Sequence, residues 1–176
     1  MTQQTSTDDI RRAFERIEQD ALQRDAAFER RALRNYLLHT LLTVAGRHDE
    51  LFEYDTAVAD PDYVFFDNGR RVQGRDAIAR YHRDEGVLSV PIDQRVAMSH
   101  WGFAGEQTLE AWLPDGTLRR TRCAFVWRCD DRGRMTSLRF YPAARHESLG
   151  AAPRPAGGAT LAKDLAPLVE RVRKMQ

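Results

Sequence analysis

The chain has 176 residues, of which 42% are hydrophobic and 30% are charged, and this length and composition are typical of one globular domain. Its 27 Lys and Arg nearly balance its 26 Asp and Glu for a formal net charge of +1, which argues against the strong positive field of a nucleic-acid-binding protein. No apolar run is long enough to span a membrane and the first residues are polar, so we expect no membrane partner, no signal peptide and a cytoplasmic location.

A long helix is predicted over residues 8–46, with Gly46 as its stop. In its first half, residues 10–28, the apolar side chains form only a thin stripe on a charged cylinder. The stretch 33–44 is apolar nearly all round. We therefore expect the second half to be buried and the first half to lie on a surface or on a partner.

The middle of the chain mixes helix and strand. A short helix is predicted over 48–58, and Pro61 with its flanking aspartates ends it. Residues 63–66 are aromatic and β-branched, which predicts a strand, and the Asp-Asn-Gly sequence at 67–69 ends that strand in a turn. The further elements predicted here are a strand at 71–73 and a helix over 75–85.

Beyond Pro91 the apolar residues recur with a period of two, which is typical of strands. Compact turns separate these segments and indicate an antiparallel meander. The two cysteines, Cys123 and Cys129, then lie on one strand with Cα atoms roughly 20 Å apart, too far for a disulfide. We expect both to be free thiols. The predicted strands are residues 94–103, 106–113, 118–129 and 134–141.

The composition changes after Pro142 to Ala, Pro, Gly and Arg, which predicts a flexible linker. An amphipathic helix follows it. Helices followed by a meander predict an α+β fold in which a curved antiparallel sheet wraps around the N-terminal helices. The chain is thereby divided into an N-terminal helical extension (1–29), an α+β domain (30–142), a linker (143–159) and a C-terminal helix (160–176).

Two motifs carry a resemblance to a known family. One is Val-Gln-Gly-Arg-Asp-Ala-Ile at 72–78, followed by Tyr81, and the other runs from Phe125 to Met135 and on into 138–141. In this order and spacing they resemble the nuclear transport factor 2-like superfamily, in particular its SnoaL-like polyketide cyclase branch. The resemblance implies a cone-shaped fold around a mostly apolar cavity. It also implies isomerases, dehydratases, cyclases, epoxide hydrolases and non-catalytic binding modules, so it specifies the fold better than the chemistry.

By resemblance to ketosteroid isomerases, the general-base aspartate at the end of the first strand corresponds to Asp67. Burial in an apolar cavity would raise the pKa of this carboxyl and let it take a proton from a carbon acid or a water. The alternative is that Asp67 only begins the Asp-Asn-Gly turn and is solvated.

The same resemblance aligns His39 with the tyrosine that donates a hydrogen bond to the substrate oxygen, and His82 with a second, supporting tyrosine. Two imidazoles in place of two phenols would keep a donor–acceptor relay but lower its ordinary pKa from about 10 to about 6.5. We expect His39 to be buried, with its charged form disfavoured by desolvation. The alternative for each is an ordinary histidine satisfied by backbone groups.

Phe125 stands where those isomerases carry a second donor, a protonated aspartic acid, and it can donate no hydrogen bond. This argues against a steroid-type isomerase. Alternation along 118–129 places Phe125 and Trp127 on the face toward the cone, and Arg122 and Ala124 on the other. An aromatic ligand-binding wall is predicted there, with plain core packing as the alternative. Its predicted residues are Tyr36, Tyr81, Phe125, Trp127, Leu138 and Phe140.

The other histidines lack metal-ligand spacing and no Gly-rich phosphate loop is present, so we expect no metal and no cofactor. The predicted function is a cofactor-independent lyase, isomerase or cyclase that acts by acid–base chemistry on a small apolar, aromatic or polyketide-like metabolite. Asp67 is its base, and His39 and His82 are its donor pair. The alternative is a non-catalytic ligand-binding or dimerisation module. The apolar stripe of the first helix half either folds back over the domain or packs on a second chain. We expect a homodimer, joined through this stripe or through the outer face of the meander around Ala124 and Val126.

Overall fold

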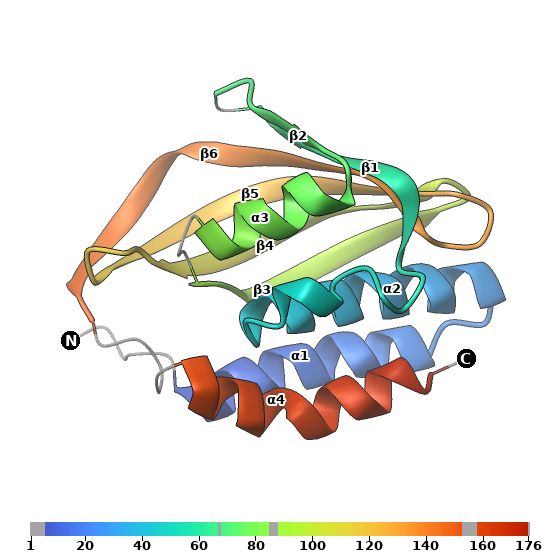
Figure 1. Cartoon of the computed structure of the whole chain (residues 1–176), viewed down its shortest axis with the longest axis horizontal. Coiled ribbons are helices and arrows are strands. Elements are labelled where there is room, and N and C mark those ends of the chain that lie inside the picture. The colour runs from blue at the N-terminus through green and yellow to red at the C-terminus, as the bar shows by residue number, and fades with distance from the viewer. Residues whose placement is uncertain (1–5, 67, 85–87, 153–157, 176) are drawn as a thin grey trace.

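A computed structural model describes residues 6–66, 68–84, 88–152 and 158–175, apart from the side chains of 144–146 and 158–160. A curved sheet forms one layer, and α1, α2 and α4 pack together beneath it, while α3 lies against the sheet near β1 and β2 (Figure 1). This confirms the predicted α+β class. The helices are α1 (Thr7–Leu22), α2 (Ala27–Val44), the 3-10 turn η1 (His48–Glu50), α3 (Arg75–Asp84) and α4 (Gly158–Arg173).

The sheet of the described residues has six strands in the order β2-β1-β6-β5-β4-β3. β3 to β6 follow one another along the chain and form the predicted antiparallel meander. β1 joins this meander in parallel to β6, so the sheet is mixed rather than wholly antiparallel. The strands are β1 (Ala57–Phe65), β2 (Arg71–Gln73), β3 (Leu88–Ser99), β4 (Gly102–Trp112), β5 (Thr117–Cys129) and β6 (Met135–Ala151).

The helix predicted over 8–46 is two helices that fold back on each other. Arg30 stabilises the connection by donating to the backbone carbonyls of Arg24 at 2.7 Å and Asp25 at 2.8 Å. Folding back lets the apolar stripe of α1 pack against α2, α4 and β3, and Phe14 is fully buried there. The stripe is covered by the chain itself, because this arrangement removes more apolar surface from water than one continuous helix would.

The two ends of the chain share one hydrophobic cluster with the middle. α1, within the region 1–29 that the sequence set apart as an extension, and α4 both contribute fully buried side chains to it. β6 continues through residues 143–151, so this part of the predicted linker is a strand, and 153–157 lie outside the described residues. Pairing with β5 supplies the backbone hydrogen bonds here, which local composition does not reveal.

Two further boundaries differ from the prediction. The helix predicted over 48–58 is the single turn η1, and β1 already begins at Ala57. Pro61 therefore lies inside β1, at an irregularity of the β1–β6 register where no ladder N–H is required. The first hairpin of the meander turns at residues 100–101 rather than after Phe103.

α2 lies close to the β5–β6 turn because Gly133 leaves room for it. Gly133 has a φ of +75°, and a Cβ there would lie 2.9 Å from the backbone nitrogen of Ala32. Asn35 Nδ2 donates to the carbonyl oxygen of Gly133 at 2.9 Å. These contacts fix the height and rotation of α2 over the sheet, and with them the positions of Tyr36 and His39.

Candidate active site

A connected set of polar side chains runs through the interior from α2 to α3. The hydroxyl of Tyr63 on β1 forms a hydrogen bond with His39 Nε2 on α2 and lies 3.0 Å from His82 Nε2 on α3. We call His39, Tyr63 and His82 the relay. His48 in η1 extends it outward, because its ring stacks on that of His82 with centroids 6.0 Å apart.

The local structure explains why these side chains face one another. Alternation along β1 turns Tyr63 inward, where it is 1% exposed, while its neighbours Asp62 and Val64 are only partly covered. His39 lies three residues after Tyr36, on the face of α2 that packs against the sheet. His82 comes from the last turn of α3, which covers β1 and β2.

The Tyr63 hydroxyl has a single proton, so it donates to one imidazole and accepts from the other. If His39 Nε2 accepts, then His82 Nε2 carries the proton that it donates to Tyr63, and in the reversed state the roles exchange. His39 Nδ1 is buried and has no hydrogen-bond partner within the described part of the chain. One end of the relay is therefore a buried nitrogen with a hydrogen-bonding position that none of the described residues uses, which we call the open end.

Burial keeps the relay neutral. Desolvation lowers the pKa of His39 to about 3 and raises the pKa of Tyr63 well above its usual 10. The pKa of His82 falls well below 6.5 through desolvation first and the nearness of His39 and His48 second. The structure buries His39, as predicted, and this burial disfavours its charged form. Three neutral groups in one hydrogen-bonded row can pass a proton without holding a charge at rest.

Four residues of the predicted ligand wall pack into the core. Tyr36 stacks on Phe125 with centroids 5.6 Å apart and meets the edge of Trp127 at 5.1 Å. Its hydroxyl donates to Gln94 Oε1 at 2.7 Å. Tyr36, Phe125, Trp127 and Leu138 are each at most 4% exposed, so any ligand that contacts them must first displace a side chain.

The other two wall residues, Tyr81 and Phe140, are half-buried, and only Tyr81 contacts Tyr63 among the ring contacts of the described residues. The ring of Tyr81 is 6.2 Å from that of Tyr63. Phe65 contacts Tyr81 at 5.3 Å and stacks on Phe140 at 5.6 Å. The ligand-binding role of all six wall residues stays a prediction, but Tyr81 flanks the relay directly and Phe140 lies behind Phe65.

The two predicted histidines come together, with ring centroids 6.0 Å apart. Asp67 lies outside the described residues, so its role as the base also stays a prediction. The sequence reasoning missed Tyr63, the residue that joins the two histidines. The signal was present, since alternation within 63–66 places Tyr63 and Phe65 on one face and Val64 on the other.

Neither cysteine offers a nucleophile to this site. Cys123 and Cys129 are free thiols on β5, as expected. Burial raises the pKa of Cys129 to about 12, so its thiol stays protonated at neutral pH. Across the described ranges, no group of three His, Cys, Asp or Glu side chains could hold a metal ion. None of the helices in those ranges is long and apolar enough to cross a membrane.

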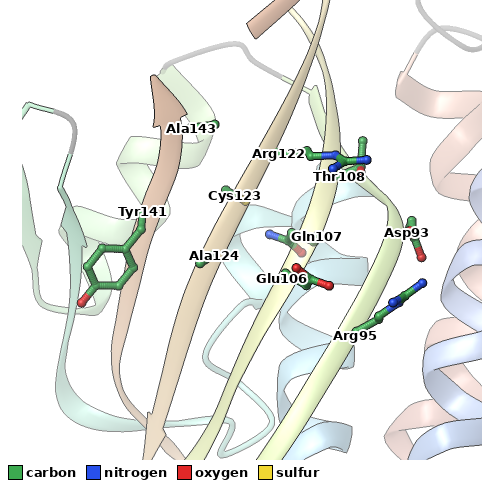
Figure 2. Close-up of a pocket in the computed structure, with 10 residues that line it drawn as sticks. All are labelled: Asp93, Arg95, Glu106, Gln107, Thr108, Arg122, Cys123, Ala124, Tyr141 and Ala143. Atoms are coloured by element: carbon green, nitrogen blue, oxygen red, sulfur yellow. The ribbon is translucent and has the colours of Figure 1, made fainter. Parts of the chain in front are cut away.

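A shallow hollow of about 360 Å³ lies on the opposite, outer face of the sheet (Figure 2). Its centre is a row of register partners on four strands: Arg95 on β3, Glu106 on β4, Ala124 on β5 and Tyr141 on β6. All four are exposed, which confirms the predicted faces of β5. The full lining is Asp93, Arg95, Glu106, Gln107, Thr108, Arg122, Cys123, Ala124, Tyr141 and Ala143.

No protein-family profile matches the sequence, and no curated protein does. Solved structures do match the fold. A Mycobacterium tuberculosis epoxide hydrolase described as LEH-like shares 18% identity with the chain, at a TM-score of 0.53 over 80% of this chain and 96% of that one. A Δ5-3-ketosteroid isomerase from Mycobacterium sp. shares 20% identity, at a TM-score of 0.50 over 63% and 92%.

A computationally designed 17-OHP binder has the same fold, with 15% identity and a TM-score of 0.53 over 66% of this chain and 98% of that one. At these identities the likeness concerns the fold, and the site must be argued from its own residues. The curved sheet, the helices beneath it and these matches agree with the resemblance carried by the two sequence motifs. The chain has the α+β cone fold of the nuclear transport factor 2-like superfamily.

Proposed function

We propose that this protein is a cofactor-independent lyase, isomerase or cyclase that moves a proton on a small, apolar metabolite through the relay. The observation that carries the proposal is the Tyr63 hydroxyl between two neutral, buried imidazoles, with His39 Nδ1 left without a partner. A buried polar atom without a partner is costly, and a ligand that supplies one recovers that cost. The aromatic surroundings of the relay favour an apolar ligand, aromatic or polyketide-like.

The proton steps follow from the geometry. The C–H bond beside a ligand carbonyl breaks, its electron pair stays on the ligand as an enolate, and the proton bonds to His39 Nδ1. The Nε2 proton of His39 moves to the Tyr63 oxygen, and the Tyr63 proton moves to His82 Nε2. His82 then holds the positive charge, beside His48 and nearer the surface.

Each reaction class uses the same enolate differently. Return of the proton to another carbon isomerises the ligand, and loss of a leaving group from the next carbon is a lyase reaction. Attack of the enolate carbon on a second carbonyl closes a ring. All three need one proton acceptor and a site from which water is excluded, and the burial of His39 provides both.

The low pKa of His39 in the empty site does not prevent it from acting as a base. Negative charge develops on the ligand as the proton leaves, and an opposite charge within about 4–6 Å raises an imidazole pKa. Asp67, predicted as the base by resemblance, is a second proton acceptor for the same enolate chemistry. The two assignments differ in which substitution stops the reaction.

Enolisation of a model ketone tests the proposal without knowledge of the substrate. The protein is incubated with 2-tetralone in deuterium oxide, and loss of the α-proton NMR signal gives the exchange rate. We expect wild type to accelerate exchange and His39→Gln to lose about 100-fold or more of that acceleration, as removal of a general base does. His100→Gln, the same change at an exposed histidine, is the matched control and should exchange like wild type.

The alternative function is a non-catalytic ligand-binding module. The tight packing of Tyr36, Phe125 and Trp127 and the very low pKa of His39 favour it, since both describe a site built for stability. In that case 2-tetralone shifts the NMR signals of His39 but its α-protons exchange no faster than in buffer. This outcome would overturn the enzymatic proposal.

We infer further that the outer face of the sheet joins two copies of the chain. The hollow carries Asp93 and Glu106 beside Arg95 and Arg122, so one patch offers both carboxylates and guanidinium groups for pairing with the same patch of a second copy about a two-fold axis. Exposed Phe66 stacks on exposed Tyr141 at 4.3 Å beside this row and adds apolar surface. The helix stripe, buried within the chain itself, leaves this face as the proposed seam of a homodimer.

A further inference from the structure

A cleft of about 470 Å³ opens between η1 and α3, next to the relay. It is separate from the hollow on the outer face of the sheet. Acidic and basic side chains rim it, and one aromatic side chain, Phe52, forms part of its wall. The lining is Asp49, Phe52, Glu53, Arg75, Asp76, Ala79, Arg80 and Arg83.

Phe52 separates this cleft from His39. Its ring lies 5.7 Å from that of His39, and the same half-buried side chain lines the cleft. His39 is 3% exposed, and its Nδ1 has no partner within the described residues. A ligand in the cleft is therefore one side chain away from the open end of the relay.

The surroundings of Phe52 let its side chain move while the walls stay in place. Phe52 lies in the irregular turn between η1 and β1, so rotation of its side chain breaks no helix or strand ladder. Arg75 is fixed, because it donates to the carbonyl oxygens of Val58 at 2.9 Å and Ala57 at 2.5 Å. Its guanidinium lies 5.7 Å from the Phe52 ring and holds that ring without a covalent or hydrogen-bonded lock.

The charges of the cleft favour an uncharged ligand. Three acidic and three basic residues line it, and Asp49 pairs with Arg83. Beyond Phe52 the relay itself is neutral, so a charged ligand would lose its hydration without gaining an opposite charge. A flat ring that enters as Phe52 swings out takes the place of an aromatic ring and needs no larger space.

We propose that the cleft between η1 and α3 is the entrance to His39, that Phe52 is the gate that closes it, and that the ligand it admits is an uncharged molecule with a planar ring and a polar group that bonds His39 Nδ1. This inference rests on the proposed role of the relay. It adds the route, the moving side chain and the chemical class of the ligand. The test measures how fast a reagent reaches His39, and it does not depend on catalytic turnover.

Diethyl pyrocarbonate, which modifies accessible neutral imidazoles, provides the readout. The modification rate of His39 is followed by peptide mass spectrometry in wild type, in Phe52→Ala and in Tyr81→Ala. Tyr81 is the matched control, since it is also half-buried and flanks the relay from the Tyr63 side. We expect Phe52→Ala to raise the modification rate of His39 about tenfold or more, because the reagent no longer has to wait for the Phe52 side chain to rotate away. Tyr81→Ala should leave that rate within about twofold of wild type. Phe52→Trp should slow it below wild type.

Two probes then test the ligand class. Phenol, neutral at pH 7, should protect His39 in the Phe52→Ala protein, whereas benzoate, an anion with the same ring, should not. A faster reaction in Tyr81→Ala than in Phe52→Ala would overturn the gate, and so would an unchanged rate in a folded Phe52→Ala protein. Protection by benzoate equal to that by phenol would overturn the ligand class.

Folding is monitored in the same samples through the fluorescence of Trp112 and Trp127, which are fully buried and shift their emission to longer wavelength if the core opens. If Phe52→Ala shows that shift, Phe52→Leu is measured instead, and His39 must still react faster in it than in Tyr81→Ala for the gate to stand. The outcome is independent of catalysis. If Phe52→Ala speeds the modification of His39 but the protein does not accelerate tetralone exchange, the gate is supported and the enzymatic proposal is wrong. If the protein accelerates exchange but Phe52→Ala has no effect on the modification rate, the enzymatic proposal is supported and the gate is wrong.

Discussion

The two faces of the sheet contrast sharply in how they treat polar groups. On the inner face, β5 contributes Phe125 and Trp127, and the titratable groups above them, His39 among them, are buried and neutral. On the outer face, the alternating residues of the same strand include exposed charged side chains, Arg122 and Arg128. Neighbouring residues about 3.3 Å apart along the strand therefore lie in different environments, one apolar and one aqueous.

This contrast indicates that the inner face suits proton transfer and that the outer face suits association with a second copy. In the interior, a neutral hydrogen-bonded row is the cheapest way to keep polar atoms, because an isolated charge there costs far more than it does at the surface. On the outer face, charges cost little and can be matched by a second copy. The relay is therefore expected to respond to protons, and the outer face to protein concentration.

Tyr63→Phe should have the largest effect on the inner face. It keeps the ring but removes the hydroxyl that joins His39 to His82, so tetralone exchange should fall by about 10²–10⁴-fold. Buried imidazole nitrogens then lack a partner, and urea unfolding should show a loss of about 1–3 kcal/mol. Tyr54→Phe, which removes a hydroxyl bonded to Glu50 at 2.9 Å, is the control and should leave exchange unchanged. Normal exchange in Tyr63→Phe would remove the relay from the mechanism.

Asp67→Asn tests whether a carboxylate also accepts the proton from the ligand. If Asp67 is the base, exchange should fall by about 100-fold while the thermal midpoint stays within a few degrees, because Asn has nearly the same size and shape as Asp. If Asp67 only begins the turn, the change should be silent. Exchange rate and thermal midpoint measured together separate the two, and full activity in the Asn protein rules the carboxylate out.

Acid should destabilise the inner face. The pKa of His39 is lowered from 6.5 to about 3, so the unfolded chain binds the proton more tightly. The stability from neutral His39 is complete above pH 6.5 and is lost as pH falls toward 3. Between pH 7 and pH 5 the free energy of unfolding should drop by about 2 kcal/mol from this group alone, and the lowered pKa of His82 acts in the same direction. His39→Gln should flatten this slope, and an equally steep slope in that variant would contradict the assignment.

Ala124→Glu should have the smallest effect on folding and a clear one on assembly. Ala124 is exposed and pairs across strands with Glu106, so the variant sets like charges together in the centre of the proposed seam. The free energy of unfolding should change by about 0.5 kcal/mol or less, while light scattering should show the dimer dissociating. Ala59→Glu, at an exposed position outside the hollow, is the control. If wild type is monomeric at micromolar concentration, the outer face does not join two copies.

Local sequence patterns were enough for the faces and for most of the elements. Period-two alternation assigned Phe125 and Trp127 to the face toward the cone and Ala124 to the opposite face, and the structure buries the first two and exposes the third, because each strand residue faces opposite to its neighbours. Two short motifs were enough to indicate the cone fold, and the burial of His39 followed from the apolar helix around it. All of these depend on residues close together along the chain.

The contacts between distant segments were beyond such patterns. The break in the first helix lets α1 pack against α2, α4 and β3, and β6 extends past 143 because β5 pairs with it. Tyr63 joins imidazoles that lie 24 and 19 residues away, through an alignment that depends on how closely Gly133 lets α2 approach the sheet. Alternation predicts the direction in which a side chain points, but only the packing of the whole chain brings three such side chains within hydrogen-bond distance.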